Sequence, residues 1–133
     1  MFPVVVAGGH AIDALRSIAV AQHLFGIENI VVVHHSYCSA TTFTAQRIID
    51  AYEHEHHTDI SGLYDRASLC IEDYEASLKQ DAALIRSHPG TPSHVNIFGY
   101  FYDIDTGVLT EAVGIEPRRL SRTSSRVAMG KRW

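Results

Sequence analysis

The sequence predicts a single α/β domain, in which a mostly parallel β-sheet is flanked by helices and followed by a C-terminal hairpin. Three observations predict this class. Two β-branched runs, 4–7 and 30–33, enclose a stretch with the apolar spacing of a helix, which is the βαβ pattern. An apolar strand with a tight turn and a return strand comes later, at 95–112. The length of 133 residues, with 46% hydrophobic and 20% charged residues, suits one ordinary folded domain.

The first unit is predicted from its local patterns. Residues 4–7 end at Gly8-Gly9, which predicts a buried strand followed by a tight turn. Residues 11–25 repeat apolar side chains every three or four positions and precede Gly26, so they predict an amphipathic helix with its stop signal. Residues 30–33 are apolar without alternation, which is typical of a strand buried on both faces.

The remaining elements follow the same logic. Helices are predicted over 42–57 and over 67–87, and Pro89 ends the second of them. Residues 95–102 predict a strand, Asp105-Thr106-Gly107 a tight turn, and 108–112 the return strand. All fifteen acidic residues lie at or before Glu116, whereas six of the eleven basic ones lie in the last sixteen positions. We therefore predict an α/β domain over 1–115 and a basic, flexible or partner-docked tail over 116–133.

Composition excludes several classes of protein. No apolar run reaches the roughly 18 residues that cross a bilayer, and the start lacks the pattern of a signal peptide, so we expect a cytoplasmic protein with no membrane partner. Only Cys38 and Cys70 occur, and in that compartment we expect both to be reduced. No nucleic-acid-binding module precedes the basic tail, so we expect no nucleic-acid partner.

The segment His34 to Ser39 carries the chemistry. It follows the buried strand directly, at the carboxyl end where open α/β sheets place their sites. His35 and Cys38 stand two residues apart, so an imidazole nitrogen and a thiolate sulfur can meet on one tetrahedral zinc. A buried thiol and a helix-capping histidine are the alternative explanation of the same pair.

Five stretches in order carry a resemblance to a known family. They are Ala7-Gly8-Gly9 with the Asp13 to Ile18 helix, the strand ending in His35-x-x-Cys38, Thr42-Phe43-Thr44, Ile85 to Pro89, and Gly99 to Leu109. Together they resemble the β-carbonic anhydrases over nearly the whole body of the chain. The resemblance implies a β-carbonic anhydrase-like fold, His35 and Cys38 as two of three protein ligands of a catalytic zinc, and Gly8, Gly9, Tyr37 and Ser39 at the substrate pocket.

The same resemblance implies a Cys-x-Asp-x-Arg segment ahead of the Ala-Gly-Gly turn, which supplies the family's first zinc cysteine and an Asp-Arg dyad. Six residues precede that turn here and no such segment occurs, so we expect an N-terminally truncated or divergent member. Ser39 also replaces the family's usual glycine. The omitted strand belongs between 4–7 and 30–33, which either pair directly or leave a gap for another chain. We therefore expect a homodimer or a higher oligomer.

Other candidates were weighed for a metal site. His10 is the better candidate third ligand, with an exposed helix-start histidine as its alternative, because strand alternation turns His34 away from His35. Cys70 lies on an amphipathic helix and is expected in the core. The histidines and glutamates at 53–57 fail the zinc-protease pattern and suit a solvated helix end. Tyr37 either lines the pocket or packs against a neighbouring subunit.

Three functional hypotheses follow. The first is reversible hydration of carbon dioxide to bicarbonate by a zinc lyase, lowered by the loss of one ligand and of the dyad. The second is a repurposed scaffold that performs another zinc-assisted lyase or hydrolase reaction. The third is a non-catalytic dimeric relative without metal.

Overall fold

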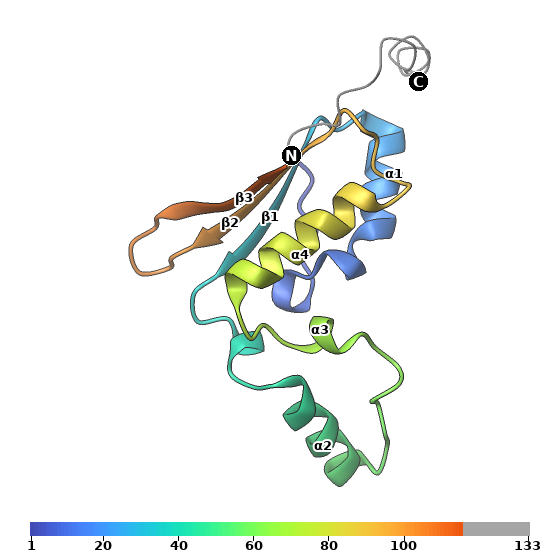
Figure 1. Ribbon diagram of the computed structural model, residues 1–133, viewed down its shortest axis with the longest axis vertical. Coiled ribbons are helices and arrows are strands. Elements are labelled where there is room, and N and C mark those ends of the chain that lie inside the picture. The colour runs from blue at the N-terminus through green and yellow to red at the C-terminus, as the bar shows by residue number, and fades with distance from the viewer. Residues whose placement is uncertain (116–133) are drawn as a thin grey trace.

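The protein is described by a computed structural model over residues 1–115 (Figure 1). The predicted tail, 116–133, lies outside the described residues, so its boundary stays a prediction. The longer elements are, in chain order, helix α1 (Leu15–Phe25), strand β1 (Asn29–His35), helices α2 (Ala45–His56), α3 (Arg66–Leu69) and α4 (Tyr74–Ser87), and strands β2 (Asn96–Tyr102) and β3 (Leu109–Ile115). Short 3-10 turns cover Ala7–Gly9, Ala11–Asp13 and Ser39–Thr41.

The sheet confirms the predicted α/β class and the C-terminal hairpin. Its order is β1-β2-β3, with β1 parallel to β2 and β2 antiparallel to β3, so it is mixed rather than mostly parallel. The parallel pair is in register from Asn29 opposite Asn96 to His35 opposite Tyr102. The carboxyl ends of β1 and β2 therefore lie side by side.

One face of the sheet is covered by helix α4, which contacts all three strands (Figure 1). The core lies between them and consists of Ala11, Val32, Leu78, Ala82, Ile85, Val95 and Ile97. Helices α2 and α3 form a separate excursion between β1 and α4 (Figure 1). None of the described helices is long and apolar enough to cross a bilayer.

The predicted strand over 4–7 is wrong. Residues 4–6 form no strand and Ala7–Gly9 is a 3-10 turn. In the described residues β1 pairs only with β2. Residues 4–7 therefore form no ladder of hydrogen bonds with the other edge of β1. Val5 is 92% exposed. β-Branched residues favour strands only where they can pack on a neighbour, and Val5 has none to pack on.

The single helix predicted over 67–87 is divided into α3 and α4. Residues 70–73 are not helical, with extended backbone at Cys70 and Asp73, and the Asp73 carboxylate accepts hydrogen bonds from the backbone N–H groups of Glu75 and Ala76. This is an N-cap, and it starts a new helix where apolar spacing alone suggested a continuous one. The other helix predictions are confirmed: Thr44 caps α2, and Gly26, with φ 58°, ends α1.

Candidate metal centre

The carboxyl end of β1 presents two adjacent histidines to opposite faces of the sheet. Side chains alternate along a strand, so His34 points to the α4 side, where it is 2% exposed, and His35 points to the open side. The chain then turns at Tyr37, which has a φ of 59°. Ser36 secures the turn, because its N–H donates to Tyr102 O at 2.9 Å and its Oγ accepts from Ile104 N at 2.9 Å.

The predicted donors lie on either side of this turn, with His35 at the end of β1 and Cys38 after Tyr37. His35 Nδ1 lies 2.7 Å from the Ser36 carbonyl oxygen, and as the donor in that bond it leaves Nε2 with the lone pair that binds metal. Cys38 is a free, partly exposed cysteine. Its carbonyl accepts from Thr41 N at 3.0 Å and from Thr41 Oγ1 at 2.7 Å, so the segment after the strand is fixed. Imidazole and thiolate are typical zinc ligands. Within residues 1–115, however, His35 and Cys38 do not form a cluster with a third potential ligand.

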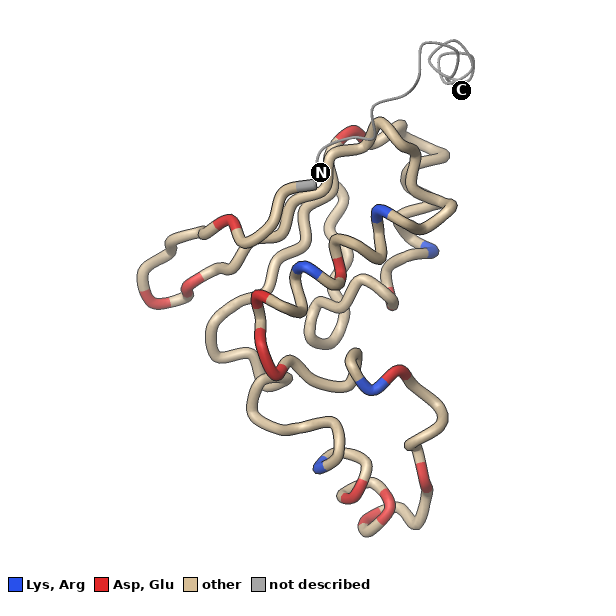
Figure 2. Tube along the Cα trace, viewed as in Figure 1, with Lys and Arg blue, Asp and Glu red and all other residues tan. Residues whose placement is uncertain are grey.

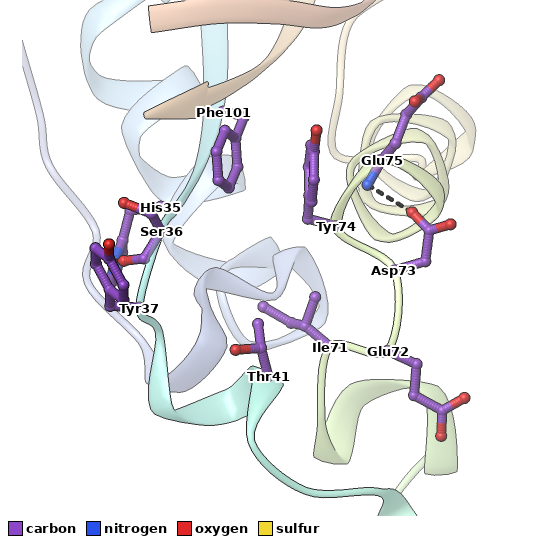
Figure 3. Close-up of a pocket in the computed structure, with 10 residues that line it drawn as sticks. All are labelled: His35, Ser36, Tyr37, Thr41, Ile71, Glu72, Asp73, Tyr74, Glu75 and Phe101. Carbon is purple, nitrogen blue, oxygen red and sulfur yellow. Dashed lines mark hydrogen bonds between the residues drawn. The ribbon is translucent and has the colours of Figure 1, made fainter. Parts of the chain in front are cut away.

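An open cleft of about 570 Å³ adjoins His35 (Figure 3). One wall carries His35, Ser36 and Tyr37, while the facing wall comes from the start of α4. Its full lining is His35, Ser36, Tyr37, Thr41, Ile71, Glu72, Asp73, Tyr74, Glu75 and Phe101. Tyr74 stacks on Phe101 with ring centroids 4.1 Å apart, which joins α4 to β2 at the cleft.

The predicted pocket residues divide into two groups. Tyr37 lines the cleft, and its hydroxyl donates to Asp105 Oδ2 at 2.5 Å. Gly8, Gly9 and Ser39 are not in its lining. The glycine turn lies against the end of β1 instead, because a Cβ on Gly9 would approach the carbonyl oxygen of Val33 and the ring of His34, each at 3.2 Å.

His10 joins a different set of side chains. It is 4% exposed and lies with His34 and Asp81, so it is not the exposed helix-start residue of the alternative, while its role as a third ligand beside His35 and Cys38 stays a prediction. The Asp81 carboxylate raises the pKa of His10 against the opposing effect of burial. Burial by itself would raise the pKa of Asp81, but the two imidazoles outweigh it and that pKa is lowered.

Asp81 is the residue that the sequence interpretation missed. The signal was present, because Asp81 lies three residues after Leu78 and four before Ile85, on the apolar face of α4. A carboxylate in an apolar stripe needs a buried partner. Cys70 is 5% exposed, as expected of a core residue, and His54, His56 and His57 lie on an exposed helix end, also as expected.

Comparisons with known proteins place this architecture. No protein-family model matches the chain. β-Carbonic anhydrase 1 of Mycobacterium tuberculosis is 32% identical over 101 residues, which cover 74% of this chain and 58% of that protein. The carbon disulfide hydrolase of Acidithiobacillus thiooxidans is 24% identical over 111 residues, 73% of this chain and 56% of that protein. A solved carbonic anhydrase from Streptococcus mutans superposes with a TM-score of 0.70 at 34% identity, over 80% of this chain and 63% of that one.

The fold is that of an α/β protein in which the predicted metal donors His35 and Cys38 lie at the carboxyl end of β1, beside β2. Over the residues that it shares with these relatives, the chain belongs to the β-carbonic anhydrase family. It spans 58% of the length of the curated relative from M. tuberculosis.

Proposed function

We propose that this chain is a zinc protein of the β-carbonic anhydrase type, in which His35 and Cys38 bind the metal and the reaction is hydration of carbon dioxide to bicarbonate. The observation that carries the proposal is the place of this pair: His35 is the last residue of β1 and lines the cleft, and Cys38 comes three residues later. Zinc bound there supplies Lewis acidity toward water. Because the 133-residue sequence has no Cys-x-Asp-x-Arg, we expect a rate below that of relatives that contain it.

The residues around the donors prepare the site. The Ser36 carbonyl fixes the ring of His35, while the Ser36 N–H donates to Tyr102 O and the Ser36 Oγ accepts from Ile104 N, which holds the turn against β2. A donor held in this way loses little conformational entropy when it binds metal. Both cysteines are free thiols, which a metal-binding Cys38 requires and which suits the cytoplasmic location that we propose with it.

The charge of the cleft favours an uncharged substrate. Glu72, Asp73 and Glu75 line it, and Lys79 offsets only one of them, through a 2.7 Å ion pair with Glu75. Figure 2 shows these acidic residues grouped at the beginning of α4. Carboxylates repel an anion but not an uncharged molecule. The cleft therefore favours entry of carbon dioxide and departure of bicarbonate.

Metal analysis and a stopped-flow assay test the proposal on Cys38→Ala, with Cys70→Ala as the matched control. The unaltered chain is expected to bind zinc and to hydrate carbon dioxide, and Cys38→Ala to lose the activity and the zinc bound through the thiolate. The control should keep both, because Cys70 is a core residue. Activity that survives in Cys38→Ala would contradict the assignment.

A second candidate is hydrolysis of carbon disulfide. The relative from A. thiooxidans supports it, because that protein matches nearly as much of the chain as the carbonic anhydrase does. Carbon disulfide is also small, linear and uncharged, so the same cleft would admit it. Sulfide release by the zinc-loaded chain, in the absence of carbon dioxide hydration, would favour this reaction.

We further propose self-association through the sheet face opposite α4. Val31 and Val33 are 51% and 44% exposed there and pair with Phe98 and Tyr100, and no element within residues 1–115 covers them. An exposed apolar face of this kind favours association. Sedimentation equilibrium should show a dimer or larger species that Val33→Lys weakens, whereas a monomeric parent chain would contradict the proposal.

A further inference from the structure

The cluster His10, His34 and Asp81 is buried between the glycine turn, β1 and α4. Its three residues are 4%, 2% and 5% exposed. Ring or carboxylate atoms from all three lie within 4.8 Å of one another. His10 Nε2, both ring nitrogens of His34 and Asp81 Oδ2 are buried without a hydrogen-bond partner. Buried polar atoms are normally paired, so this concentration of unpaired ones requires an explanation.

Direct pairing of the three residues does not explain it. His34 Nε2 is 3.4 Å from Asp81 Oδ2, and His10 Nδ1 is 3.7 Å from the same oxygen. Charge-assisted hydrogen bonds are shorter, at about 2.7 to 2.9 Å. Two ligands of one tetrahedral zinc, each about 2.0 to 2.2 Å from the metal, are about 3.3 to 3.6 Å apart. The observed spacing is therefore closer to that of two ligands on one ion.

The donor set also has the right chemistry. Two imidazoles and a carboxylate are typical zinc ligands, and the cation would neutralise the charge of the buried carboxylate. Three protein ligands leave the fourth position for a water molecule. All three residues are buried, so the ion would be enclosed.

We propose that His10, His34 and Asp81 form a second, buried metal site for zinc or a similar divalent transition metal, with a structural role. It lies on the α4 side of β1, whereas His35 points to the opposite face and Cys38 follows the turn after the strand. The adjacent histidines thus belong to separate sites. A metal there would tie the turn after Gly9 to both β1 and α4.

The test uses the full chain carrying His35→Ala and Cys38→Ser, which removes the donors of the proposed zinc centre. After chelation, this double variant is titrated with Zn²⁺ and with Co²⁺. We expect one equivalent of metal to bind, and the cobalt spectrum to lack a thiolate-to-metal charge-transfer band. X-ray absorption should report two imidazoles and only nitrogen or oxygen ligands. No stoichiometric binding, or a sulfur ligand, would overturn the proposal.

A third change separates the cluster from adventitious binding. Asp81→Asn in the double variant should lower the affinity at least 100-fold, while Asp50→Asn, an exposed acid on α2, should leave it unchanged. Metal that survives Asp81→Asn would overturn the proposal. If Asp81→Asn fails to fold, the metal titration of the double variant and its ligands from X-ray absorption still test the proposed site. Because that variant lacks the catalytic donors, failure of the carbon dioxide reaction leaves this test unaffected.

Discussion

Replacement of Gly9 by alanine tests how the glycine turn supports the buried end of β1. Gly9 has a φ of 68°, which costs an L residue about 1 to 2 kcal/mol. The added Cβ would also lie 3.2 Å from the carbonyl oxygen of Val33 and from Cδ2 of His34. Overpacking of this kind typically costs a further 1 to 3 kcal/mol, roughly. We expect a total loss of about 2 to 5 kcal/mol in the free energy of unfolding.

Gly26→Ala supplies the matched control. Gly26 has a φ of 58° and ends α1, but nothing lies within 4 Å of the Cβ that alanine would add. It therefore carries the conformational cost of about 1 to 2 kcal/mol without the steric one. The difference between the two variants isolates the contact with β1.

Urea unfolding of both variants and the parent chain, at one protein concentration and free of metal, measures these losses. Gly9→Ala should lower the free energy of unfolding by at least about 1 kcal/mol more than Gly26→Ala does. Equal losses, within about 0.5 kcal/mol, would refute the reasoning, because they would show that the turn does not press on Val33 and His34.

Two further predictions concern the helix that carries Asp81. Asp73→Ala removes the cap that accepts hydrogen bonds from Glu75 N and Ala76 N. We expect it to lower the free energy of unfolding by about 1 kcal/mol in a urea titration. No change would mean that water caps α4 equally well. Leu78→Ala empties a site that is 0% exposed and should cost about 2 to 5 kcal/mol by the same titration, whereas Leu63→Ala, 64% exposed, should stay within about 0.5 kcal/mol. Similar losses in both leucine variants would contradict the placement of the core.

The sequence predicted most of the elements because their signals are local. Apolar spacing followed by Gly26 defined α1, and Asp105-Thr106-Gly107 identified the turn between β2 and β3. The strand over 4–7 failed because strand formation depends on a partner that no local pattern reveals. The break before α4 was missed for the opposite reason: Asp73 is a local cap signal, but the apolar spacing on both sides of it outweighed it in the interpretation.

The site was only half predictable for a related physical reason. The two-residue spacing of His35 and Cys38 is local, and their place after β1 follows from the strand alone. Asp81 reaches His34 only because α4 packs across the sheet, some 47 positions further along the chain (81 minus 34). Spacing identifies residues that one turn brings together, whereas a cluster assembled by packing needs the fold.

With the two metal sites proposed above, the adjacent histidines would let one strand end serve two chemistries. Alternation requires that His34 and His35 face opposite sides, so a metal bound by one is not bound by the other. They nevertheless share a backbone, and the turn at Gly9 lies against the carbonyl of Val33, the residue before them. An ion between His10, His34 and Asp81 would therefore restrain the strand end that leads to His35. Loading of the buried site should sharpen the geometry of the exposed donors without contributing a ligand to them, because rigid supports reduce the entropy lost when a metal binds.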